Sequence, residues 1–264
     1  MEFYGNFSEN YRSITFSDIR VVNPSFQVDP NISDEAGFTA DFGARGRISI
    51  VLTYDASLFR LYYDDRLGEI LEEETRTNSE GEEVPTGGIV RKRGNIGTAF
   101  IYGLEPFADV NLKSLLNFKS EKIKFNYFAK MALTASEYTD SERIGVAGNE
   151  VEFIPDMNLK TGLSFGYGNM LGSLQYTYLG QQFTDATNAA QDLTDNQRGI
   201  EGAIPSYDIL DFSLSYTYKG YKLEAGINNL LNTTYFTRRA TGYPGPGIIP
   251  AEPSTFYTTL QIKI

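Results

Sequence analysis

The sequence of 264 residues contains no cysteine, no histidine and no tryptophan. Without histidine and cysteine the chain cannot build a Ser-His-Asp triad, a cysteine nucleophile, a thiolate zinc site or a His-ligated iron site. A metal ion could be held only by oxygen ligands, or could arrive already chelated. No disulfide can form, so the fold must rest on strand pairing and packing.

Long hydrophobic runs are also missing. The longest unbroken apolar run is Ala99–Tyr102, four residues, whereas a membrane-spanning helix needs about 20. The start, Met1-Glu2-Phe3-Tyr4, has neither the basic residues nor the apolar core of a signal peptide. We therefore expect no transmembrane helix and no leader, but a membrane β-barrel stays possible because its strands only alternate.

Positive charge is scarce, since the formal net charge is −11. A phosphate backbone needs a basic face, so we expect no nucleic-acid partner. Nine carboxylates and two arginines lie between Asp64 and Glu83. This density predicts a solvated, mobile loop. A divalent-cation or lipopolysaccharide-bridging site is the alternative, although no regular ligand spacing favours it.

Apolar and polar residues alternate along several segments of the sequence. Leu210, Phe212 and Leu214 lie on one face of an extended segment, with Asp211 and Ser213 on the other. The same period of two recurs in 50–58, 122–136, 174–179 and 223–228, and no segment sustains a period of 3.6. The pattern predicts an all-β protein with about ten strands, near 2–8, 36–45, 48–66, 92–111, 121–140, 153–167, 170–186, 204–219, 221–231 and 254–264.

Short and long connections alternate along these strands. Short ones are expected at 44–47, 167–170 and 218–221, and long ones at 9–35, 67–91, 141–152, 187–203 and 232–253. An outer-membrane barrel sorts its loops in this way, and tyrosines cluster where aromatic girdles belong. Strands near twenty residues also exceed the ~5–6 residues usual in globular sheets. We predict a single antiparallel transmembrane β-barrel domain over residues 1–264; a soluble sandwich with an apolar core is the alternative.

The segment Gly226–Phe236 reads GINNLLNTTYF. It resembles the apolar-x-N-L-x-N-x-x-Y signature near the C-terminus of TonB-dependent outer-membrane receptors, which a last loop and a terminal amphipathic strand follow. We expect Leu230 and Leu231 to face lipid or anchor the strand end, and the asparagines to cap unpaired backbone groups. An ordinary Asx turn is the alternative.

Other motifs of this family follow in order along the chain. An N-P element at Asn23-Pro24 precedes Asp34-Glu35 and a strand ending Gly43-Ala44-Arg45-Gly46, and a G-x-E strand stands at Gly103–Glu105. Ile204–Tyr207 with Asp211 resembles the P-x-Y-x-x-x-D strand. The N-P, D-E-x-G and G-x-R-G forms are most similar to the ferric dicitrate receptor branch.

Two departures from the family pattern stand out. The family ends in an aromatic residue that the barrel-insertion machinery recognises, and here the last residue is Ile264. Family members also carry an N-terminal plug, a TonB-contacting box and a 22-strand barrel, whereas this chain shows about ten strands and no plug. It resembles the last two-fifths of a receptor. Ten strands either belong to a larger barrel, close alone into a narrow barrel, or fail to fold.

The resemblance implies uptake of an iron chelate, of siderophore or ferric citrate type, across the outer membrane of a Gram-negative bacterium. It implies no covalent chemistry, no catalytic residue, no cofactor and no protein-bound metal. The implied partners are the chelate, outer-membrane lipid and lipopolysaccharide, the insertion machinery, and the TonB system through a plug. The alternatives are a small autonomous barrel with a structural or adhesin role, and a soluble β protein that binds an apolar ligand.

If the cargo is an anion such as ferric citrate, cationic side chains near the outer mouth are the expected binders. The candidates are Arg91, Arg93, Arg238 and Arg239, with Gln181 and Gln182 as hydrogen-bond partners. Contact of these arginines with lipopolysaccharide or solvent is the alternative.

Overall fold

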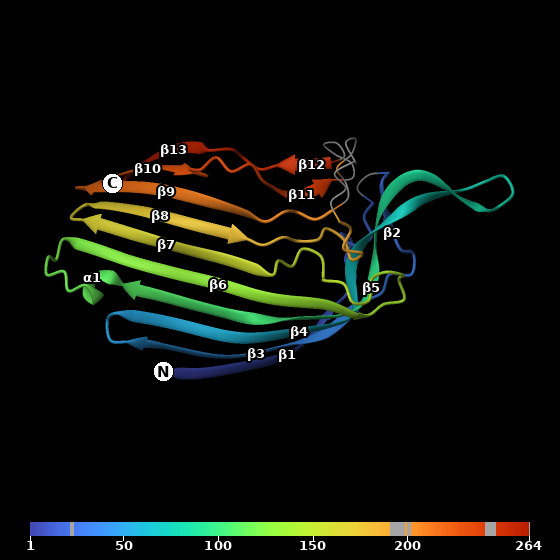
Figure 1. Cartoon of the computed structure of the whole chain (residues 1–264), viewed down its shortest axis with the longest axis horizontal. Coiled ribbons are helices and arrows are strands. Elements are labelled where there is room, and N and C mark those ends of the chain that lie inside the picture. The colour runs from blue at the N-terminus through green and yellow to red at the C-terminus, as the bar shows by residue number, and fades with distance from the viewer. Residues whose placement is uncertain (22–23, 191–198, 200–201, 241–246, 264) are drawn as a thin grey trace.

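A computed structural model describes residues 1–21, 24–190, 199, 202–240 and 247–263. Its main element is one sheet of antiparallel neighbours in the order β1-β3-β4-β5-β6-β7-β8-β9-β10-β13 (Figure 1). These strands are β1 Glu2–Arg12, β3 Glu35–Ile48, β4 Leu52–Thr77, β5 Glu83–Asn111, β6 Ile123–Asp140, β7 Met157–Tyr167, β8 Met170–Leu179, β9 Tyr207–Tyr218, β10 Tyr221–Asn228 and β13 Thr255–Ile262.

Four small elements complete the described fold. Strand β2 (Phe26–Val28) adds to the sheet in parallel beside β5, and β11 (Phe236–Ala240) pairs with β12 (Gly247–Pro250) in a separate ribbon. A single helical turn, α1 (Leu112–Leu115), follows β5. No helix among the described residues is long and apolar enough to cross a membrane.

Each of the ten strands expected from alternation has a counterpart, so the all-β antiparallel prediction is confirmed. The expected turn at 44–47 is displaced, because β3 continues to Ile48 and the turn lies at 49–51. The expected loop over 67–91 is wrong. Strands β4 and β5 run on to Thr77 and from Glu83, leaving a turn of only 78–82.

Two carboxylates of the acidic segment, Glu69 and Glu72, meet opposite charges across the hairpin. Glu72 pairs with Lys92 at 3.4 Å, and Glu69 pairs with both Arg91 and Arg93. These cross-strand ion pairs remove the repulsion that would otherwise keep such a segment open. Among the described residues, no group of three or more acidic side chains is arranged to hold a metal ion.

The connections divide between the two ends of the sheet (Figure 1). One end carries the tight turns at 49–51, 168–169 and 219–220 together with the α1 turn, and we call it the short-turn end. The other end carries the connections 13–34, 141–156, 180–206 and 229–254, and we call it the long-loop end. The predicted sorting of loops is confirmed for these connections, but not for the β4–β5 hairpin, whose turn at 78–82 is short.

The two faces of the sheet differ in polarity. The register places Phe42, Leu58, Leu104 and Leu133 in one row across four strands, and Phe42 and Leu58 are 59% and 60% exposed. We call this side the apolar face. On the opposite side, the polar face, Lys130 lies directly across from Lys160. Neither lysine has an ion-pair partner among the described residues.

The sheet is open. Strands β1 and β13 stand at its two ends, and each has a strand partner on one side only within the described residues. The narrow closed ten-strand barrel is therefore not the arrangement found. Asn23 and Ile264, which entered the motif comparison, lie outside the described residues.

A packed core is confined to the long-loop end. There the connections 141–156 and 180–190 fold over the polar face, so that Val146, Val151 and Ala186 pack against Ile96 and Tyr138. All five side chains are at most 1% exposed. We call this double-layered part the cap, and the single-layered remainder of the sheet the wall.

Candidate functional site

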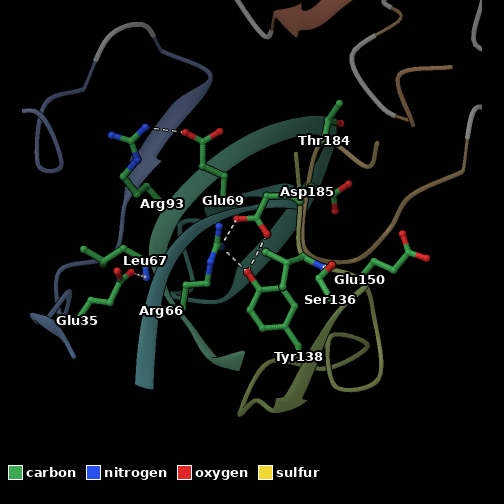
Figure 2. A network of polar contacts seen from close by, with 12 residues as sticks. Glu35, Arg66, Leu67, Glu69, Arg93, Ser136, Tyr138, Glu150, Thr184 and Asp185 are labelled. Carbon is green, nitrogen blue, oxygen red and sulfur yellow. Dashed lines mark hydrogen bonds and ion pairs between the residues drawn. The ribbon is translucent and has the colours of Figure 1, made fainter. Parts of the chain in front are cut away.

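The predicted arginines Arg91 and Arg93 lie beside each other on the polar side of β5, in the cap. Both contact one carboxylate from the opposite strand: Arg91 Nη1 lies 3.0 Å from Glu69 Oε2, and Arg93 Nη2 lies 2.6 Å from Glu69 Oε1. Figure 2 shows Arg93 reaching toward Glu69. Two positive charges share one negative charge here, so the group keeps a net charge of +1.

Arg91 is only 6% exposed and also donates from Nη1 to the carbonyl oxygen of Thr184 at 2.9 Å. Its buried Nη2 has no hydrogen-bond partner among the described residues. Arg93 donates to the carbonyl oxygen of Ser17 at 3.0 Å and covers the ring of Phe26. Both side chains thus hold connections onto the sheet, a structural role that sequence reasoning did not anticipate.

The second predicted pair lies on the small ribbon. Arg239 is buried and donates to the carbonyl oxygens of Gly199 and Ala203, at 2.8 and 2.9 Å. Arg238, its neighbour, is exposed and has no partner among the described residues. The side chain of Arg238 is therefore the predicted cation that is available to a ligand.

One connection links the two arginine pairs. Thr184, which accepts from Arg91, donates through Oγ1 to the carbonyl oxygen of Gly202 at 3.0 Å, and the next residue, Ala203, accepts from Arg239. Of the predicted glutamines, Gln181 is exposed and Gln182 forms a backbone bridge with Ile204. The structure thus brings Arg91 and Arg239 against the 180–206 connection, which contains Gln181 and Gln182, but shows no contact of Arg93 or Arg238 with it.

A buried polar triad that sequence reasoning missed holds the centre of the cap. Arg66 Nη1 donates to Tyr138 Oη and to Glu152 Oε1, both at 2.7 Å, and Tyr138 Oη donates to Glu152 Oε2 at 2.7 Å. Figure 2 shows Arg66 and Tyr138 pointing toward each other. Arg66 and Glu152 stand 86 positions apart, and no local pattern indicates such a contact.

Arg143 holds another connection. It donates to Asp29 Oδ2 at 2.8 Å and to Glu72 Oε1 at 3.2 Å. The pKa of the Asp29 carboxyl lies below its usual value because the backbone N–H of Asn31 donates to it and Arg143 and Lys92 attract its charge, against the opposing effect of burial. The ion pair therefore forms fully at neutral pH.

An acidic recess of about 520 Å³ opens beside Arg143. Its lining includes Asp29, Asp65, Asp140 and Glu142, with Arg143 as the cation. The described residues offer no paired nucleophile and base here. The predicted arginines do not line this recess, whose charged lining is mainly carboxylate.

The chain matches the family described as "TonB dependent receptor-like, beta-barrel" over residues 1–230. No curated protein matches the sequence. The fold is similar to that of several solved structures, three of which follow.

The unliganded ferric citrate transporter FecA has a TM-score of 0.72 at 20% identity, covering 98% of this chain and 35% of that one. The copper transporter OprC has a TM-score of 0.68 at 16% identity, covering 98% and 36%. The ferric yersiniabactin uptake receptor FyuA from Yersinia pestis has a TM-score of 0.66 at 16% identity, covering 98% and 34%. This chain thus spans about a third of the length of each.

Proposed function

The chain belongs to the TonB-dependent receptor β-barrel family, and we propose that it forms ten strands of the wall of an outer-membrane receptor that takes up an iron chelate. Members of the family lie in the outer membrane of Gram-negative bacteria. The observation that carries the proposal is the sheet itself, which is apolar on one face, polar on the other, and sorted into short turns and long loops.

The proposal fixes an orientation. The apolar face contacts lipid, the polar face lines the lumen, and the long-loop end faces outward, where the chelate first binds. The two edges, β1 and β13, need partner strands, because each unpaired backbone group in hydrocarbon costs several kcal/mol. The open edges favour a place in a larger barrel over a small autonomous barrel with a structural or adhesin role.

The chelate is of siderophore or ferric citrate type. An anionic chelate suits the exposed Arg238, the +1 group of Arg91, Arg93 and Glu69, and further inward the unpaired Lys130 and Lys160. Arg91 and Arg239 shape the mouth by holding its connections. Energy for release into the lumen comes from the TonB system through a plug domain. Lipopolysaccharide and the barrel-insertion machinery complete the proposed partners.

Membrane placement is tested with the purified full chain. We expect solubility only in detergent and a gel mobility that changes on heating, because the apolar face has no cover of its own among the described residues. A compact monomer in plain buffer would overturn the proposal.

Chelate binding is tested in detergent by quenching of tyrosine fluorescence, which the 18 tyrosines and the absence of tryptophan make practicable. Arg238→Ala should weaken ferric citrate binding about tenfold, the effect of one charge-assisted hydrogen bond of ~1.5 kcal/mol. Arg47→Ala removes an exposed arginine at the short-turn end and is the matched control. If the quenching titrations give both variants and the wild type the same affinity for ferric citrate, Arg238 is not a binding residue.

A further inference from the structure

One arginine stands on the apolar face of the wall. Arg60 lies on β4 between Leu58 and Tyr62, two positions from each, so all three point to the same side. Its side chain is exposed, and it forms no ion pair or hydrogen bond with any described residue. From Leu52 to Tyr62, Arg60 is the one charged residue on this side of the strand.

The guanidinium of Arg60 leans toward the long-loop end. In the register, Arg60 lies opposite Tyr102, yet its guanidinium carbon lies 4.4 Å from the ring centre of Phe100. Phe100 is the partner of Tyr62, one row nearer the long loops. The charge is therefore carried outward from its own Cα, as a long cationic side chain does when its head seeks a polar layer.

The surroundings are those of an interfacial girdle. The rings of Phe38 and Tyr62 lie 5.3 Å apart, and those of Tyr62 and Phe100 lie 4.9 Å apart, forming a continuous aromatic row. Such rows lie at the level of lipid headgroups. An arginine on the lipid side costs ~2–4 kcal/mol at the middle of the bilayer but only ~0–1 kcal/mol near its surface.

The acid available on this face does not neutralise Arg60. Glu137, opposite Phe100, and Asp64, two positions beyond Tyr62, are exposed on this side, but no ion pair joins either to Arg60 in the described structure. The Arg60 guanidinium lies over the ring of Phe100, and its N–H groups donate to no described residue. This arrangement fits an external anion with several acceptor oxygens.

We infer that Arg60 binds a phosphate group of an outer-leaflet lipid, whose acyl chains lie along the apolar face beside Tyr102 and Leu58. The inference rests on the proposed membrane placement and adds to it the headgroup that this face recognises. The fork of the guanidinium donates two parallel hydrogen bonds to one phosphate, and the aromatic row sets its depth.

The test uses the full chain in detergent micelles and a fluorescent, bis-phosphorylated lipid A, with binding followed by anisotropy. Arg60→Ala should weaken association by roughly fivefold, the effect of one cation near a lipid surface. The affinity of Arg60→Lys for lipid A should lie between those of the wild type and Arg60→Ala, because lysine keeps the charge but lacks the two parallel N–H donors of the guanidinium. Arg45→Ala is the matched control: Arg45 also covers a ring, that of Tyr4, but on the polar face.

Two further arms identify the ligand. Lipid A without its phosphates should bind wild type and Arg60→Ala equally, and inorganic phosphate at the concentration of the lipid should not displace the labelled lipid. The inference would be overturned if Arg45→Ala weakened lipid A binding as much as Arg60→Ala, or if Arg60→Ala did not weaken it. Neither outcome would change the dependence of the chain on detergent, so the proposed membrane placement would stand. Displacement by inorganic phosphate would overturn the assignment to a lipid.

Discussion

The cap and the wall are made from the same strands, but different forces hold them. In the cap, β4, β5 and β6 are covered by connections, and Tyr138 is completely buried with its hydroxyl bonded on two sides. In the wall, the same strands form a single layer whose large apolar side chains, such as Leu58, are exposed. The cap therefore supplies its own core, whereas the apolar side chains of the wall stay uncovered within the described residues, as the proposed contact with lipid requires.

The largest expected effect tests the independence of the cap. Glu152→Ala leaves Arg66 buried without its carboxylate and removes an acceptor from Tyr138, which should destabilise the cap by ~3–5 kcal/mol. Hydrogen exchange in detergent should rise in 141–156 and 180–190, while β7 to β9 keep their protection. Glu150→Ala, which removes an exposed carboxylate from the same connection, is the control. If exchange rises equally in β7 to β9, cap and wall are one cooperative unit.

The second effect tests the dependence of the wall on lipid. Leu163 lies in the apolar row between Tyr127 and Leu174, so Leu163→Arg should place a charge against hydrocarbon and cost ~2–4 kcal/mol. Urea titration of the chain folded in bilayers measures this loss. Ser164→Arg puts the same charge on the polar face and should cost much less. Equal losses would show that the two faces are not assigned as proposed.

The smallest effect concerns the surface of the cap. Because the folded-state pKa of Asp29 is below its unfolded value, its ion pair with Arg143 stabilises the fold above pH ~4 and is lost as pH falls through the folded pKa. Arg143 keeps Glu72 as a second partner when Asp29 is neutral, so the loss should be about 1 kcal/mol. Urea titrations from pH 7 to pH 3 should show a shallower fall for Asp29→Asn than for wild type. The Asp29–Arg143 pair would be excluded as the source if Asp29→Asn did not alter how the free energy of unfolding depends on pH, or if Asp140→Asn altered it equally.

The wall could be predicted from the sequence, and the cap could not. The strands of the wall were predicted because a period of two is a local property that needs no knowledge of the partner. The capping role of the asparagines was also predicted from a local motif. It is confirmed, because Asn229 Oδ1 accepts a hydrogen bond from the N–H of Thr233 and Asn232 Oδ1 accepts one from the N–H of Ser254.

The cap was not predictable in the same way. Its contacts join distant positions, as Arg66 and Glu152 do, and the density of carboxylates near Glu72 indicated a loop when the residues lie in strands. The missed signal was the facing basic segment Arg91–Arg93, which pairs with Glu69 and Glu72 across the hairpin. The prediction of ligand binding by Arg91, Arg93, Arg238, Arg239, Gln181 and Gln182 stays a prediction, although their positions at one end agree with it.

From β3 to β10 each strand pairs with the next one along the chain. Growth or shortening of such a meander proceeds in hairpins: an added pair lengthens the circumference and leaves every later loop on its own side. Loss of a single strand would instead send each subsequent loop to the opposite side of the bilayer. Changes by two strands therefore keep every loop on its own side of the wall.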